Sequence, residues 1–330
     1  MDHRPSTAPD LIAADLAPGD AGAAHLDWSG LRIERVRSAE HPLFRAAYER
    51  LRREFGTSGS MERKEVITAR FAWDPARPAG DHHLLYEMLV VRRGEEIVAV
   101  RDHTAILPAA ARDTGAVIVH LSHNLIEPAM RGSGLAGWLR ALPVQVAREC
   151  AVRAGVAATH VPTVDKDRFT LRQVQGERKT PFRNRPDTAR AELVEAQFRR
   201  ESTISITLVA EMEQPLGDGR SDSPALRSYG RAGFLKIDPE VVPYCQPDFR
   251  AADEIERTGV QPVPYALVIR RVGRETERSL PGAEVRAIVT ALYTMFGLHT
   301  RADHMASLWA CLEHLPPETE AIALLPPASA

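Results

Sequence analysis

Hydrophobic positions recur along this chain with two spacings, every second residue in some segments and every third or fourth in others. The first spacing predicts strands, and the second predicts helices with one apolar face. In the first half, these patterns predict a strand at 31–37, a helix at 42–55, a β-hairpin formed by 84–91 and 97–107, a strand at 116–126 and a helix starting at residue 135. Residues 57–82 are mostly polar, and we predict no regular element there.

The second half continues with strands and short helices, interrupted by one long charged segment. The patterns predict a strand at 204–211, a helix that begins after Ser223 and ends near Gly233, a strand at 265–272 and a helical hairpin beyond residue 282. Residues 162–202 are polar and basic, and we interpret them as an insertion.

The helix that starts at residue 135 contains a proline at position 143. Proline removes one helical hydrogen bond and costs about 3 kcal/mol in an isolated helix. We therefore predict that this helix is kinked or divided into two pieces at Pro143.

These segments set the expected domain organisation. Residues 1–28 carry small and polar side chains that bury too little surface to offset the entropy of ordering, so a disordered tail is expected. Residues 29–272 form the main domain, and residues 273–330 form a C-terminal helical extension. This extension could pack on the main domain, cover a substrate or make a homodimer.

Composition excludes several classes of protein. The chain has 330 residues and a formal net charge of −2, so no overall charge attracts it to nucleic acid or to an anionic membrane. Its three cysteines lie far apart without metal-ligand spacing, and we expect neither a metal site nor a disulfide framework. With no signal peptide and no apolar run of about 18 residues, a soluble cytoplasmic protein is expected.

Small residues stand where the strand at 116–126 gives way to the next helix. The first turn of a helix leaves N–H groups without intrahelical partners, and the helix dipole adds partial positive charge there. Gly132 and Gly134 lack the Cβ atoms that would keep a ligand away from these donors, and Arg131 adds a guanidinium group. The junction is therefore predicted to bind an anion such as a phosphate.

A dinucleotide-binding fold is one alternative, because Gly132, Gly134 and Gly137 also match the pattern G-x-G-x-x-G. That fingerprint requires the first glycine directly after a strand and an acidic residue about 20 positions later. Here 127–131 intervene, and 150–156 contain no acidic residue. The sequence context therefore disfavours this alternative.

The same turn resembles motif A of the GNAT superfamily of acyl-CoA-dependent N-acyltransferases, in which Arg or Gln is followed at fixed spacing by Gly and by Gly or Ala. Arg131, Gly134 and Ala136 fill those places. About a hundred residues later, the end of a predicted helix resembles motif B of that family, with Tyr229 four positions before the pair Gly233 and Phe234. The two motifs occur in the family's order.

The resemblance implies an α/β protein with a mixed sheet and the GNAT-like acyl-CoA N-acyltransferase fold. It implies that acetyl-CoA, or another acyl-CoA, is the co-substrate and that no metal takes part. Its pyrophosphate would lie against Arg131, Gly132, Ser133, Gly134, Leu135 and Ala136, and its pantetheine arm would contact the backbone of Asn124, Leu125 and Ile126.

The resemblance also assigns catalytic roles. Tyr229 would protonate the departing thiolate, because a phenol with a pKa near 10 is protonated at neutral pH. Since an amine with a pKa near 10.4 is mostly protonated at pH 7, a general base is useful. Glu127 is the first candidate and Glu211 the second. His120 is a further candidate, and so is His123, although the position of His123 within its strand favours a role in the core.

The predicted acceptor is an amine on a small molecule or peptide. Relatives often carry an asparagine before the motif B helix, whereas residues 211–215 contain none, which leaves the acceptor side undefined. A non-catalytic CoA-binding or nucleotide-binding sensor, or an interaction module, is therefore the alternative function. The basic insertion, with Arg183 and Arg185, could act as a lid for an acidic acceptor.

Overall fold

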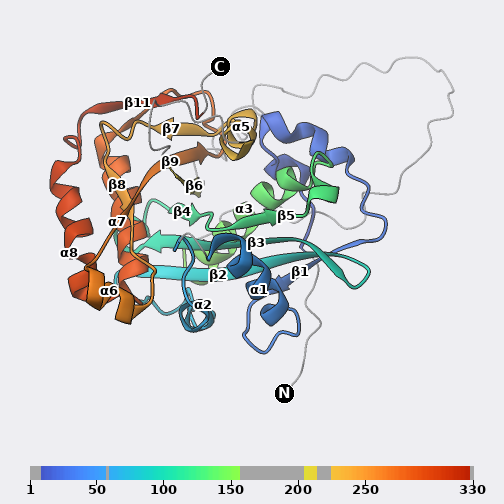
Figure 1. The fold of residues 1–330 in the computed structure, drawn as a ribbon. Helices are drawn as coiled ribbons and strands as arrows, with labels where there is room; N and C mark the ends of the chain where they lie inside the picture. Colours follow the sequence, from blue (N-terminus) through green and yellow to red (C-terminus); the bar gives the residue numbers. More distant parts are fainter. Residues whose placement is uncertain (1–8, 57–58, 157–203, 214–223, 328–330) are drawn as a thin grey trace, which may run out of the picture.

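The computed structural model describes residues 9–56, 59–156, 204–213 and 224–327. A large, mostly antiparallel sheet forms its centre, and helices pack on both faces (Figure 1). The fold class is therefore mixed α/β, as the sequence predicts. The insertion predicted at 162–202, with Arg183 and Arg185, lies outside the described residues.

Eleven strands form the sheet in the order β1-β2-β3-β4-β6-β9-β7-β11-β10, with β5 paired to β3 and β8 paired to β9. The strands are β1 (Leu31–Val36), β2 (His82–Arg93), β3 (Glu96–Pro108), β4 (Ala116–His120), β5 (Asn124–Ile126), β6 (Ser205–Glu213), β7 (Leu235–Ile237), β8 (Tyr244–Gln246), β9 (Val263–Arg271), β10 (Ser279–Pro281) and β11 (Ala321–Leu325). All paired strands of the described chain run antiparallel except β4 and β6, which are parallel.

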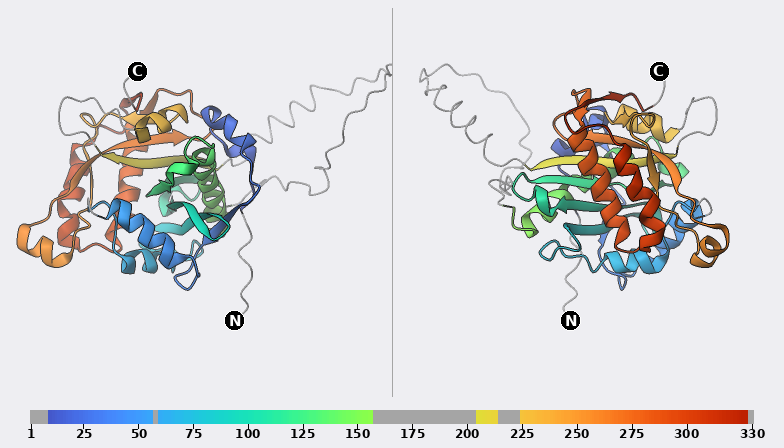
Figure 2. Two further views of the ribbon diagram at one scale, coloured as in Figure 1. Left: turned by 45° about the vertical axis from the view of Figure 1, so that its right-hand side comes forward. Right: turned by 90° about the vertical axis from the view of Figure 1, so that its left-hand side faces the viewer.

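The helices are α1 (Phe44–Phe55), α2 (Lys64–Arg70), α3 (Leu135–Arg153), α5 (Pro224–Arg231), α6 (Ala252–Thr258), α7 (Gly282–Gly297) and α8 (Ala302–Cys311). β4 shows how they cover the sheet. Val117 and Val119 pack in one core with Ala147 of α3, whereas Ile118 packs in another core with Ile288 of α7. We call these sides the α3 face and the α7 face; α5 also packs on the α3 face (Figure 2).

The segments with the clearest periodicity form the predicted elements. The strand at 31–37, the helix at 42–55 and the hairpin of β2 and β3 are confirmed. The predicted break at Pro143 is wrong, because α3 runs as one helix from Leu135 to Arg153. Its central residues, Pro143 included, are buried on the sheet, and this packing offsets the hydrogen bond that proline removes.

The prediction of a disordered tail is wrong for residues 9–28, which pack against α3 as two short 3₁₀ helices, Ala13–Asp15 and Pro18–His25. Asp20 accepts two hydrogen bonds from the buried Arg140 guanidinium, at 2.6 and 2.9 Å. Trp138 Nε1 donates to the Ala23 carbonyl at 2.7 Å. Contacts with residues more than a hundred positions away thus order this segment, which its own sequence would leave disordered. We call residues 9–28 the N-terminal segment.

The C-terminal part contains the predicted helices α7 and α8, but it is more than a helical extension. β10 and β11 join the sheet next to β7, and Ile322 and Leu324 of β11 belong to the same core as α7. Of the three arrangements considered from sequence, packing on the main domain is therefore the one observed. The short strands were not predicted, because each gains its stability from neighbouring strands.

Candidate functional site

A break in strand pairing interrupts the middle of the sheet. The last hydrogen bond between the β4 region and β6 runs from the Leu121 N–H to the Val209 carbonyl, at 2.7 Å. The chain then crosses 121–123 and continues as β5, which pairs with β3 rather than with β6. At this place, β5 and the end of β6 are not hydrogen-bonded to each other. We call it the opening.

Backbone groups of β5 line one side of the opening. His123 and Glu127 direct backbone groups toward β3, where each makes a hydrogen bond. Because successive residues of a strand alternate, Asn124 and Ile126 direct their N–H and C=O groups away from β3, toward the opening. Of the three residues predicted to contact a ligand through their backbone, Asn124 and Ile126 therefore face the opening, whereas Leu125 faces β3.

The predicted anion-binding turn precedes α3. Gly132 and Gly134 have φ angles of 78° and 94°, in the left-handed region that favours glycine. Within the described part of the chain, the N–H groups of Gly132, Gly134 and Ala136 have no hydrogen-bond acceptor. Arg131 is exposed, and its Nε donates to the Ile126 carbonyl at 3.3 Å. Three free donors and a cation therefore lie together.

The remaining predicted residues of this turn have structural contacts. The Ser133 hydroxyl donates to the Met130 carbonyl at 2.7 Å and accepts from the Leu135 N–H at 3.3 Å. Leu135 itself is buried in the core beneath β2 and β3. These two residues close the turn and anchor it to the sheet.

The N-terminal segment approaches the same turn. A Cβ atom at Gly137 would lie 2.9 Å from the Ala23 Cβ, and one at Gly134 would lie 3.0 Å from the Ala23 Cα. A Cβ atom at Gly132 would meet nothing within 4 Å. Tight packing therefore accounts for Gly134 and Gly137, whereas Gly132 and Arg131 border open space.

Tyr229 lies on the α3 face of the sheet, held by α5. Its ring packs edge-on against Phe234, with ring centres 4.8 Å apart. Arg101 of β3 donates from Nη1 and Nη2 to the Tyr229 hydroxyl oxygen, at 3.4 and 3.3 Å. Since the guanidinium only donates, the phenol's own proton remains free for another acceptor.

Two buried polar atoms on the same face of the sheet as Tyr229 lack partners. Arg101 is fully buried, and its Nε has no hydrogen-bond acceptor; the buried Oδ1 of Asn124 has no donor. Arg101 and Asn124 are paired in the register of β3 and β5, so their side chains project from the same face of the sheet. Unpaired buried polar groups cost about 1–3 kcal/mol each, which makes a ligand with one acceptor and one donor a suitable occupant.

Glu127, the first predicted base, lies at the end of β5 in an ion pair. Its Oε1 is 2.6 Å from Arg50 Nη1 of α1, and both side chains are about one-third exposed. The structure therefore brings Glu127 to α1 rather than to the Tyr229 phenol.

Glu211, the second candidate, and His120 are brought together on the α7 face. His120 Nε2 lies 2.9 Å from Glu211 Oε2, and His120 Nδ1 lies 3.1 Å from the Ser122 hydroxyl oxygen. Tyr244 and Gln246 donate to the same carboxylate at 2.5 and 3.0 Å. The arrangement fits a histidine with its proton on Nε2, so that Nδ1 accepts the Ser122 proton.

The charge of Glu211 is stabilised by these partners. Burial raises the pKa of its carboxyl, but the interaction with His120 and the hydrogen bonds from Tyr244 and Gln246 lower the pKa more strongly. Glu211 is therefore a carboxylate that orients His120, and His120 is the group that can exchange a proton with a ligand through Ser122.

His123 is a buried structural histidine, as its position in the sequence favours. Its backbone N–H and its Nδ1 both contact Asp102 Oδ1, at 2.8 and 3.0 Å, and its Nε2 lies 3.2 Å from the Ser60 carbonyl oxygen. Tyr86 donates to the other carboxylate oxygen of Asp102 at 3.0 Å. These contacts fix 121–123, the residues at which the strand pairing breaks.

Sequence reasoning missed Arg101, Asp102 and Ser122. Arg101 and Asp102 stand in the middle of an apolar strand, and charged residues at such positions are rarely buried without a partner. Two charged residues in the middle of an apolar strand were therefore the sequence feature that pointed to a site here. Ser122 offered none, because one serine between two histidines is common in loops.

Among the residues that the structure describes, no cluster of three or more His, Cys, Asp or Glu side chains is arranged to hold a metal ion. None of their helices is long and apolar enough to cross a membrane. No family model, no curated protein and no solved structure matches the chain.

The His123–Asp102 pair predicts how stability depends on pH. Burial lowers the pKa of His123, but the charge and hydrogen bond of Asp102 raise it more, to about 9. Because this lies above the unfolded value of about 6.5, the stabilisation is complete below pH 6.5 and is lost as the pH rises to 9. We expect the free energy of unfolding, from urea titrations, to fall by about 1 kcal/mol per pH unit in this window.

His123→Gln should flatten that dependence, whereas His25→Gln, at an exposed histidine, should keep it. An equally steep fall in His123→Gln would contradict the assignment.

Proposed function

We propose that the protein is an acyltransferase that moves an acyl group from acyl-CoA, with acetyl-CoA as the first choice, directly to an amine. One observation carries the proposal. The opening has the Tyr229 phenol on the α3 face and the His120–Glu211 pair on the α7 face. A thioester carbonyl held there would have an acid and a base on opposite sides.

The order of elements supports the resemblance to the GNAT superfamily. Strand β1, helix α1, the β2–β3 hairpin, β4, the glycine turn and α3 occur in the order that the resemblance implies, with α2 added before the hairpin and β5 before the turn. A dinucleotide-binding fold is disfavoured, because its repeated βαβ units would require several parallel pairs, whereas the described sheet has one.

The polar groups around the opening suit the parts of acyl-CoA. Gly132 and Arg131 offer a free N–H and a guanidinium to a phosphate group. An amide presents one acceptor and one donor, which would satisfy Arg101 Nε and Asn124 Oδ1. The pantetheine arm contains such amides. Because the N-terminal segment packs on Gly134 and Gly137, we expect the phosphates on the open side of the turn.

The reaction needs two proton transfers. The amine nitrogen attacks the thioester carbonyl carbon from the α7 face, the C–S bond breaks, and an amide forms. The proton lost by the amine passes through the Ser122 hydroxyl to His120 Nδ1, and Glu211 stabilises the resulting imidazolium. The thiolate leaves on the α3 face and takes the Tyr229 proton. This assignment replaces Glu127 by His120 as the base.

A non-catalytic ligand sensor is the alternative function, favoured by one observation. Both candidate carboxylates, Glu127 and Glu211, are already engaged by other side chains. The two functions differ in turnover, because a sensor would bind acyl-CoA without consuming it in the presence of a panel of amines.

CoA binding is the first test. Calorimetric titration of the folded protein with CoA should show binding, and Arg131→Ala should weaken it about 10-fold, because a charge-assisted hydrogen bond to a phosphate is worth about 1.5–3 kcal/mol. Arg45→Ala, at an exposed residue of α1, is the matched control and should bind like the wild type. Absence of CoA and acetyl-CoA binding would rule out the acyltransferase.

Tyr229→Phe tests the acid. Loss of the phenolic proton should lower kcat by 10-fold or more while leaving CoA affinity nearly unchanged, because the ring and its packing on Phe234 remain. Tyr48→Phe removes another buried hydroxyl, which donates to a backbone carbonyl, and should keep the wild-type rate. An unchanged rate in Tyr229→Phe would remove this residue from the mechanism.

His120→Gln tests the base. The variant should lower kcat by about 10²-fold or more, since a general base contributes about 10² to 10⁴. Glu127→Gln should change kcat by no more than a few-fold. The reverse pattern would restore Glu127 as the base and assign His120 to structure.

A further inference from the structure

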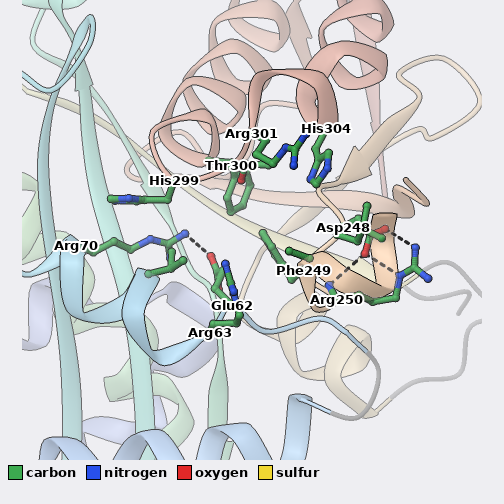
Figure 3. A pocket seen from close by; sticks show the side chains of 14 residues that line it. Glu62, Arg63, Arg70, Asp248, Phe249, Arg250, His299, Thr300, Arg301 and His304 are labelled. Carbon is green, nitrogen blue, oxygen red and sulfur yellow. Dashed lines mark hydrogen bonds and ion pairs between the residues drawn. The ribbon is translucent and has the colours of Figure 1, made fainter. Parts of the chain in front are cut away.

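A pocket on the α7 side contains polar groups that the proposed transfer does not use. It lies between α2, α6 and the adjoining ends of α7 and α8, and it encloses about 90 Å³ (Figure 3). Its lining combines four arginines with two acidic residues. The net charge of this lining is therefore positive, which favours an anionic occupant.

Arg70 is the central group of this pocket. Its side chain is 1% exposed, and one nitrogen, Nη2, is paired with Glu62. Its Nε and Nη1 are buried and have no hydrogen-bond acceptor. The guanidinium carbon lies 5.6 to 5.9 Å from the rings of Trp73, Tyr86 and Phe296, which hold the group in place. Burying these N–H groups without an acceptor therefore costs free energy, and the aromatic rings keep the guanidinium in one position.

His299 supplies a second unpaired group beside Arg70. Its buried Nε2 has no partner, and its ring stacks on Trp73 with ring centres 5.5 Å apart. Burial and the charge of Arg70 lower the pKa of His299, so the ring is neutral at pH 7 and can donate one hydrogen bond from Nε2. Figure 3 shows both side chains on the same side of the pocket.

The remaining walls decide the type of anion. Val66, Phe249, Ile255 and Phe296 contribute apolar surface, which suits a short hydrocarbon chain. Because Glu62 already neutralises part of the charge on Arg70, a singly charged group fits better than a phosphate dianion. The planar guanidinium and a neighbouring histidine N–H match the two oxygens of a carboxylate.

We propose that this pocket binds a small organic acid through its carboxylate, with Arg70 and His299 as donors. The site is separate from the thioester chemistry, although Phe296 forms a wall of the pocket and also contacts the His120 ring, with ring centres 5.4 Å apart. The proposal does not require the acyltransferase activity.

Butyrate is the probe, because a carboxylate on a three-carbon chain fits the volume. Isothermal titration of the full chain at pH 7 should show saturable binding of butyrate and none of butan-1-ol, which has no charge. Arg70→Gln combined with Glu62→Gln removes both charges without leaving one unpaired, and it should weaken butyrate binding at least 10-fold. A thermal melt checks that this variant is folded.

Val66→Phe provides a second test that leaves the charges intact. It fills the pocket and should abolish butyrate binding, whereas Val152→Phe, at a valine of α3 that is 44% exposed, should bind like the wild type. Absence of butyrate binding to the wild type, equal binding by the filled variant, or tighter binding of inorganic phosphate than of butyrate would each overturn the proposal. CoA binding and turnover are measured separately, so failure here leaves the acyltransferase proposal untouched.

Discussion

Hydrogen bonds between Asp102 and His123 hold the chain where the strand pairing breaks. Asp102 accepts both the backbone N–H and the ring Nδ1 of His123. Burial raises the pKa of the Asp102 carboxyl, but the charge and hydrogen bonds of His123 lower it well below its usual value. A buried ion pair with satisfied hydrogen bonds can fix one conformation of the backbone. Here it fixes the point at which β5 leaves β6, and the opening exists because of that departure.

Three consecutive polar residues of β3, Arg101 to His103, contact partners on different faces of the sheet. Because side chains alternate along a strand, Arg101 projects to the α3 face and Asp102 to the other face. Arg101 meets Tyr229, Asp102 meets His123, and His103 lies 3.4 Å from the buried carboxylate of Glu87. Polar groups in the middle of a strand are costly to bury, and each of these three residues lies next to a specific polar side chain. The sheet therefore positions polar groups on both faces without requiring a flexible loop.

Local patterns were sufficient for the long elements and insufficient for everything that depends on distant partners. The two apolar runs of β2 and β3 on either side of a turn, and the apolar face of α1, predicted those elements, since each is specified by its own sequence. The N-terminal segment was missed because Asp20 is ordered by Arg140, 120 positions away. α2 was missed because its 7 residues lie in a mostly polar stretch, and it is held by the burial of Ile67 and Arg70.

The candidate site also combines features that a few adjacent residues specify with features that depend on distant residues. Sequence motifs singled out Tyr229 and the glycine turn as candidates, because each motif consists of a few adjacent residues. They put Glu127 before Glu211 and His120, although the choice depends on which side chain lies next to each group, and in the structure Arg50 lies next to Glu127. The pocket around Arg70 was invisible, because its lining comes from segments more than two hundred residues apart.

The surroundings of Gly115 indicate where the chain tolerates insertions and deletions. A Cβ atom there would contact both Val156 Cγ1 and Ile204 Cα, each at 3.6 Å, so the two ends of the segment between them meet at one place on the sheet. The entropic cost of joining two fixed chain ends grows only with the logarithm of the number of residues between them, at about 0.6 kcal/mol for each doubling. The parallel pairing of β4 and β6 should therefore be nearly indifferent to how many residues lie between those ends, and a foreign domain or a short linker could be exchanged into this position while the sheet stays intact.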